Sequence, residues 1–106
     1  MTILPPAESR LEWSPPFRQE LPYNEVFPLI DALNRRTGQN WRLPTEREVR
    51  AKPFDANDAR GTYWLLTNRR GGVIPVWDYI TRQWGGLRWY FPAKIRLVRV
   101  VGPSRV

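Results

Sequence analysis

The sequence predicts a single α+β domain. Two segments with apolar residues at helical spacing, at about 24–37 and 46–51, precede several short β-rich segments separated by turns. Helices followed by an antiparallel meander are typical of the α+β class. A chain of 106 residues supports one modest core. We therefore divide it into an extended proline-rich N-terminal arm, residues 1–22, and one domain, residues 23–106.

The arm contains five of the eleven prolines. Proline fixes φ and removes a backbone donor, so we expect residues 1–22 to be extended and mostly irregular. Within the arm, residues 10–14 (RLEWS) have the pattern of a short edge strand with Leu11 and Trp13 on one face.

The first helix is expected over about residues 24–37. Asn24 is the expected N-cap, and Gly38 is the expected C-terminal cap. The apolar residues repeat at helical spacing and form one stripe: Val26, Leu29, Ile30 and Leu33.

The second helix is expected over about residues 46–51, after an extended junction. Leu43 precedes Pro44 and is therefore pushed toward extended geometry. Thr45 and Glu48 have the spacing of a capping box. We expect Trp41 in the core and Glu48 either in the cap or paired with Arg96 or Arg99. We therefore expect the junction, including Arg42, to have a structural role and not a catalytic one.

The remaining elements are read as strands and turns. Residues 62–67 and 73–80 are β-rich, and Pro75 in the second segment suggests an edge strand or a bulge. Residues 68–72 and 81–86 are expected to be turns, and residues 87–91 and 94–101 the last two strands.

Residue types exclude several classes of chemistry. The chain has no cysteine and no histidine, which removes disulfides, thiolate nucleophiles, imidazole bases and the usual zinc sites. Asp55 and Asp58 could ligate calcium, but their spacing lacks the ligand count of a known loop, and turn chemistry is favoured. We expect no catalytic residue, no metal and no cofactor.

The charge points to acidic partners. The formal net charge is +7, and Lys52 and Lys94 are the only lysines among seventeen basic residues. Arginine presents a planar fork that suits carboxylates, phosphates and aromatic faces. Nucleic acid, an acidic protein surface and anionic lipid all fit such a field, and so does a purely solubilising surface.

The aromatic region between residues 77 and 91 is the expected contact face. Its arginines alternate with aromatic residues, a composition that is enriched in interface hot spots and also in surfaces that stack bases. We expect Trp84 at a turn, and Arg88 and Tyr90 on one strand face, with Leu87, Trp89 and Phe91 on the core face. In the alternative without a binding role, Trp77 and Trp89 are core residues and the other aromatic and arginine residues of this region are ordinary surface residues. The candidate partner-binding residues are Arg69, Arg70, Arg82, Trp84, Arg88 and Tyr90.

Three motifs together resemble a known family. They are Trp41-Arg42-Leu43-Pro44-Thr45 with Glu48, then Tyr63-Trp64, and finally Ile95-Arg96-Leu97-Val98-Arg99. Over about residues 20–101 the chain resembles the DUF1566 family, also called the Lcl C-terminal family, of bacterial and phage proteins.

The resemblance implies a C-type-lectin-like fold, similar to formylglycine-generating enzymes and to the variable proteins of diversity-generating retroelements. Leu65 and Leu66 stand where the family often has two serines. The cysteines of the formylglycine-generating enzymes and the calcium-binding lectin signature are missing, so neither activity is implied.

We therefore expect a non-catalytic binding module that recognises another protein or a surface polymer, in keeping with a phage or mobile-element origin. The alternative is a nucleic-acid-binding module that uses an arginine and aromatic face. The first residues lack a secretory signal pattern, and no run of ~20 apolar residues exists. A soluble protein is expected, in a bacterial cytoplasm or on an assembled particle, with its oligomeric state open.

Overall fold

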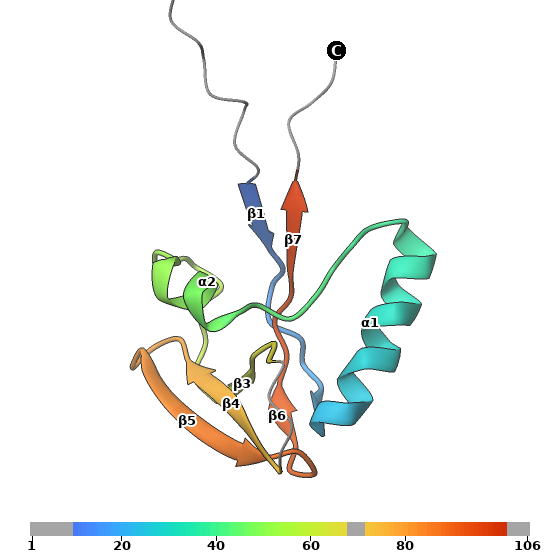
Figure 1. Ribbon diagram of the computed structural model, residues 1–106. Coiled ribbons are helices and arrows are strands. Elements are labelled where there is room, and N and C mark those ends of the chain that lie inside the picture. The colour runs from blue at the N-terminus through green and yellow to red at the C-terminus, as the bar shows by residue number, and fades with distance from the viewer. Residues whose placement is uncertain (1–9, 68–71, 102–106) are drawn as a thin grey trace, which may run out of the picture.

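The computed structural model describes residues 10–67 and 72–101, and it confirms the α+β class (Figure 1). The elements in chain order are β1 Arg10–Trp13, β2 Glu20–Leu21, α1 Tyr23–Thr37, α2 Glu46–Ala51, β3 Tyr63–Trp64, β4 Val73–Asp78, β5 Gln83–Arg88, β6 Ala93–Lys94 and β7 Val98–Val101. None of the described helices has the length and apolarity needed to cross a bilayer.

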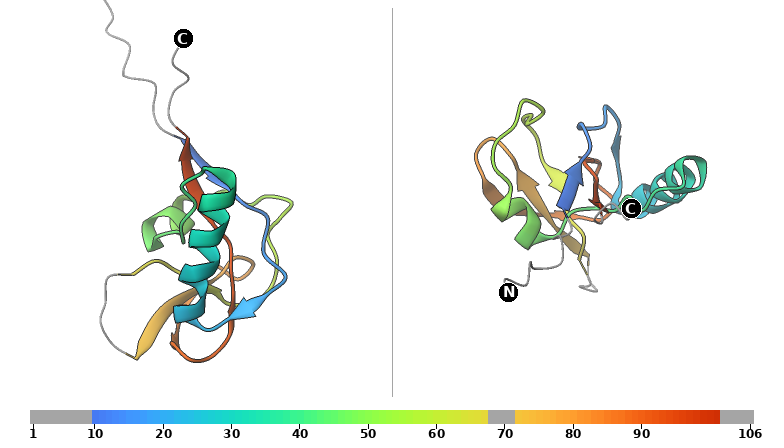
Figure 2. Two further views of the ribbon diagram at one scale, coloured as in Figure 1. Left: turned by 90° about the vertical axis from the view of Figure 1, so that its right-hand side faces the viewer. Right: turned by 90° about the horizontal axis from the view of Figure 1, so that it is seen from above.

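The strands form two sheets. A five-stranded sheet has the order β2-β6-β3-β4-β5, in which only β3 and β6 are parallel. Strands β1 and β7 form a separate antiparallel pair, so the segment predicted as an arm contributes strands to both sheets from residue 10 onward. Helix α1 and the β4–β5 hairpin lie on opposite sides of the molecule (Figures 1 and 2).

Helix α1 starts one residue earlier than expected and has a different cap. The predicted N-cap, Asn24, is wrong: Pro22 is the N-cap residue, and it makes no side-chain cap hydrogen bond. One free N–H group at the helix start is satisfied by a long-range partner, because Tyr23 N–H donates to the Trp89 carbonyl at 2.9 Å. The predicted C-terminal cap is confirmed, with Gly38 at φ 70° and its N–H bonded to the Asn34 carbonyl at 2.8 Å.

Helix α2 matches the prediction. Thr45 is the N-cap; its side chain accepts from the Glu48 N–H, and the Glu48 carboxylate accepts from the Thr45 N–H. The capping box is therefore confirmed. Only Val49 of this six-residue helix is buried, so the cap and the contacts at its C-terminal end hold it in place.

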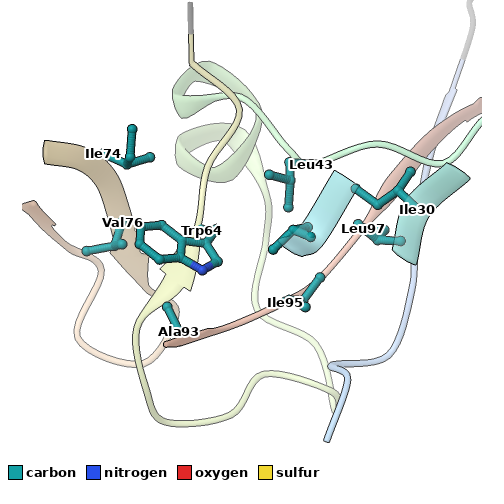
Figure 3. Close-up of a cluster of buried hydrophobic side chains, with 9 residues drawn as sticks. Ile30, Leu43, Trp64, Ile74, Val76, Ala93, Ile95 and Leu97 are labelled. Carbon is teal, nitrogen blue, oxygen red and sulfur yellow. The ribbon is translucent and has the colours of Figure 1, made fainter. Parts of the chain in front are cut away.

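The main core lies between α1 and the inner face of the five-stranded sheet (Figure 3). Trp64 is fully buried, and its indole N–H donates to the Leu21 carbonyl at 2.7 Å. The other buried members are Val26, Ile30, Leu43, Ile74, Val76, Ala93, Ile95 and Leu97. A second cluster on the opposite face of β4 contains Val49, Tyr63, Leu65, Trp77 and Tyr79, with Trp13 packed against it.

Three predicted strands are shorter or placed differently. The segment 62–67 forms a strand only at β3, and 94–101 divides into β6 and β7. The chain crosses between the two sheets at residues 95–97, where the Ile95 and Leu97 carbonyls accept from Phe17 and Ser14. Strand β4 is an inner strand, so the edge or bulge suggested by Pro75 is wrong. The missing N–H is tolerated because the β3 ladder ends at Trp64.

The predicted turn and strand after β4 are shifted. The turn occupies residues 79–82, where Arg82 has a positive φ of 55°, and Trp84 lies inside β5. Strand β5 ends at Arg88, and the chain then turns toward β6. The prediction that Trp89 and Phe91 are core residues is therefore wrong: they are 43% and 47% exposed. Leu87 is partly buried against the main core, as expected.

Candidate functional site

The Trp41–Glu48 junction is held by an ion pair within itself. Both Arg42 terminal nitrogens donate to the Glu48 carboxylate at 2.7 Å, a bidentate pair. The hydrogen bond from Arg42 is the main reason that the pKa of Glu48 lies below its usual value. The predicted alternative partners pair elsewhere, Arg96 with Asp55 and Asp58 and Arg99 with Glu12. Arg42 lies six residues before Glu48 in the chain.

Other junction residues also have packing roles. Leu43 and Pro44 are buried, whereas Trp41 is only half-buried against the main core, which corrects the expectation of a core tryptophan. The Arg99 guanidinium lies over the Trp41 ring at 5.3 Å and pairs with Glu12 at 2.7 Å. The motif that carries the family resemblance therefore stabilises the fold in this structure.

A buried ion cluster joins the loop after α2 to the crossover before β7. The Asp58 carboxylate accepts from Lys52 and from Arg96, each at 2.8 Å. Asp55 completes the cluster, at 3.0 Å from Lys52 and 2.9 Å from Arg96. The side chains of Lys52, Asp58 and Arg96 are 2%, 4% and 1% exposed. Two cations and two anions make the cluster neutral.

Aromatic rings and hydrogen bonds stabilise these buried charges. Lys52 lies 5.6 Å from the ring centres of both Trp13 and Tyr79. Burial disfavours the ionised form of Asp58, but the hydrogen bonds from Lys52 and Arg96 outweigh it and hold its pKa below the usual value. The Asp55 pKa is lowered in the same way.

The carboxylate pair that was considered for calcium is engaged within this cluster. Asp55 and Asp58 already accept hydrogen bonds from two cations. Among residues 10–67 and 72–101, no group of three or more acidic, histidine or cysteine side chains could hold a metal ion. The sequence pattern identified the two aspartates as loop residues but gave no role to Lys52, and it placed Arg96 only as one alternative partner of Glu48. The spacing of 38 residues between Asp58 and Arg96 gives no local signal.

Trp84 lies on the outer face of the β4–β5 hairpin. It is 37% exposed, and its ring packs edge-on against the buried Trp77 at 4.4 Å. The Arg50 guanidinium of α2 lies 4.9 Å from its ring centre. Beside it is a hollow of about 240 Å³, lined by Glu46, Leu66, Thr67, Pro75, Trp84 and Gly85. The indole is therefore partly exposed and held between Trp77 and Arg50.

Arg82 has an internal role. Its guanidinium donates to the carbonyls of Arg50 at 2.9 Å and Lys52 at 3.1 Å, at the C-terminal end of α2. It also lies 4.9 Å from the Phe54 ring centre. A cation at a helix C-terminus satisfies free carbonyls and complements the helix dipole. Arg82 thus fixes α2 to the hairpin on which Trp84 lies.

The turn after β5 exposes three consecutive aromatic residues. Trp89, Tyr90 and Phe91 are 43%, 52% and 47% exposed. Tyr90 packs against both neighbours, with ring centres 5.6 Å from Trp89 and 5.0 Å from Phe91. We call these three residues the aromatic turn. Its backbone is anchored, since Trp89 donates to the Gly72 carbonyl and accepts from Tyr23.

The structure brings part of the predicted face together. Arg88 is exposed and directly precedes the aromatic turn, whereas Trp84 lies four residues away along β5, roughly 13 Å from Arg88. The prediction that Arg88 and Tyr90 share one strand face is wrong, because β5 ends at Arg88 and Tyr90 follows it. Arg69 and Arg70 lie outside the described residues. Trp89 and Phe91 are the exposed residues that the prediction missed, because it extended the strand beyond Arg88.

Comparison with protein-family models, with curated proteins and with solved structures gave no match. The likeness to the DUF1566 family therefore rests on the sequence motifs alone.

Proposed function

We propose that this domain is a non-catalytic binding module that recognises an acidic surface on another protein. The contact face comprises Trp84, Arg88 and the aromatic turn. We further propose that the module is a trimmed member of the DUF1566 family, with a C-type-lectin-like fold and loops that carry the recognition. The motifs that suggest the family hold the scaffold here, and recognition belongs to residues outside them.

The observation that carries the proposal is the exposure of the aromatic turn. Three large rings in succession lie outside the core, each 43% to 52% exposed. Clustered apolar side chains on a surface mark contact sites more often than scattered ones do. Aromatic residues next to arginine are also the composition in which truncation costs the most binding energy.

Charge supports an acidic partner. The chain carries a net charge of +7, and Arg88 makes no ion pair with any residue in the described part of the chain. Its guanidinium is therefore available to a carboxylate beside the aromatic turn. Arg50, which lies over Trp84, is paired with Glu46 at 3.2 Å, but both side chains are more than half exposed. Such a surface pair exchanges partners at little cost.

The test uses two acidic polymers, poly-L-glutamate and random-sequence single-stranded DNA. We expect Arg88→Ala and Tyr90→Ala each to weaken binding to poly-L-glutamate by at least about tenfold, or ~1.4 kcal/mol. Arg35→Ala is the matched control for Arg88: it also removes one exposed arginine, from the last turn of α1 on the opposite side of the molecule. It should change the affinity by no more than about twofold.

The salt dependence separates the two partner classes. Single-stranded DNA could bind more tightly than poly-L-glutamate, with the logarithm of its affinity falling steeply and linearly with the logarithm of salt concentration. In that case the nucleic-acid alternative replaces the proposal. If Arg35→Ala weakens binding as much as Arg88→Ala, attraction is diffuse and the contact face is wrong.

A further inference from the structure

Strand β5 is an exposed sheet edge of unusual length for this domain. It is the last strand of the five-stranded sheet and has six residues, whereas β2 at the other edge has two. A six-residue strand extends over roughly 20 Å. An edge strand carries a row of unpaired backbone groups that a further strand can bind.

The register identifies which backbone groups point away from β4. In an antiparallel pair, residues alternate between those bonded to the partner and those directed to the other side. Pro75 faces Gly86 and its carbonyl accepts from Leu65 of the β3 side, so this pair is not bonded across the hairpin. Trp89, three residues on, does bond across it, to Gly72. Trp84 and Gly86 therefore direct their N–H and C=O groups to the open edge.

The devices that usually protect an edge are missing from β5. Its pairing with β4 is one-to-one from Gln83 to Arg88, so no bulge interrupts it, and it contains no proline. Its centre is Gly85-Gly86, where no side chain shields the backbone from an approaching strand. The one charged residue, Arg88, is at its end. Such an edge either associates or has a partner.

Charge selects the occupant. A second copy of this chain would bring two bodies of net charge +7 together, which opposes edge-to-edge pairing. An acidic strand would instead be attracted. Arg88 lies at one end of the edge, and Arg50 lies over Trp84 near the other end. Side chains of an added strand would alternate between the two faces of the sheet, and those on the Trp84 face would lie between these two arginines.

We propose that an extended acidic segment of the partner adds to β5 as a sixth strand of the sheet. This inference rests on the proposed function and specifies the mode of binding: backbone hydrogen bonds to Trp84 and Gly86, and carboxylates at alternate positions facing Arg50 and Arg88. The aromatic turn then contacts the end of the added segment.

The probe is a fluorescein-labelled, terminally blocked peptide of sequence TVEVEVT, with TVKVKVT as its charge-reversed control. We expect the glutamate peptide to bind at least about tenfold more tightly than the lysine peptide. In amide hydrogen exchange, Trp84 and Gly86 should exchange rapidly in the free domain and slow by at least about tenfold with the bound peptide. Gly85 and Leu87, which bond to β4, should change little.

A matched pair of variants tests the backbone contact. A Cβ at Gly86 would come within 2.7 Å of Val73 Cγ1, so both variants are made with Val73→Ala, at a side chain that is 53% exposed. Gly86→Pro removes the outward N–H and should weaken peptide binding by at least about tenfold. Gly86→Ala keeps the N–H and should bind within about threefold of the Val73→Ala domain.

Each other outcome is decisive. If the peptide binds but Gly86→Pro and Gly86→Ala bind equally and the Trp84 and Gly86 amides exchange as before, strand addition is wrong and side-chain recognition stands. Strand addition is also wrong, and side-chain recognition stands, if poly-L-glutamate binds and the peptide does not. If neither binds, the proposed function fails as well. If the two amides become protected with rising protein concentration alone, the occupant is a second copy.

Discussion

Asp58→Asn should destabilise the domain more than any surface substitution. The change keeps the shape of the side chain and removes one negative charge from the buried ion cluster. Lys52 and Arg96, 2% and 1% exposed, would then share Asp55, a carboxylate that is itself 39% exposed. One buried positive charge would be left without compensation.

The expected loss of unfolding free energy follows from this uncompensated charge. Removing one partner from a buried, hydrogen-bonded ion pair typically costs about 3–5 kcal/mol, because the remaining charge stays desolvated. For a domain of this size, that corresponds to a fall in thermal midpoint of roughly 15–30 °C. Thermal unfolding at pH 7, followed by circular dichroism and by calorimetry, measures it.

Two further variants make the interpretation specific. Asp31→Asn is the same chemical change at an exposed position of α1, and it should shift the midpoint by no more than about 2 °C. Lys52→Met combined with Asp58→Asn removes one charge of each sign, so the double variant should be less destabilised than the sum of the two single variants. If Asp58→Asn melts like the parent, the cluster is solvated and its charges need no compensation.

Three other predictions concern stability. Thr45→Ala removes the N-cap of α2 and should cost ~1 kcal/mol in urea unfolding; an unchanged urea midpoint would mean that α2 does not depend on its cap. Because the pKa values of Asp55, Asp58 and Glu48 are lowered in the folded domain, the stability that they confer is complete above about pH 5 and is lost as the pH falls through their folded values. A midpoint that stays constant down to about pH 2 would contradict this. Finally, a chelator should leave the thermal midpoint unchanged, since Lys52 and Arg96 already occupy the aspartate pair; a fall that calcium reverses would overturn this.

The local features of this protein could be predicted from its sequence. The capping box at Thr45 and Glu48, the bounds of α2, and the cap at Gly38 were predicted correctly, because each depends on residues within one turn of helix. The α+β class followed for the same reason, from the spacing of apolar residues. The Asn24 cap failed because a distant backbone carbonyl, that of Trp89, satisfies the start of α1 instead.

The positions of the arginines and tryptophans depend on contacts between distant parts of the chain. Arg96 is buried because Asp55 and Asp58 reach it across the fold, Arg82 is held by the carbonyls of α2, and Arg88 stays exposed. The same side chain can thus be a core cation, a helix cap or a free surface group. The sequence pattern could not separate these roles, because the partners are 30 to 41 residues away in the chain. The end of β5 at Arg88 was hidden for a related reason: where a strand stops depends on the neighbour that the chain must reach next, and here that turn keeps Trp89, Tyr90 and Phe91 out of the core.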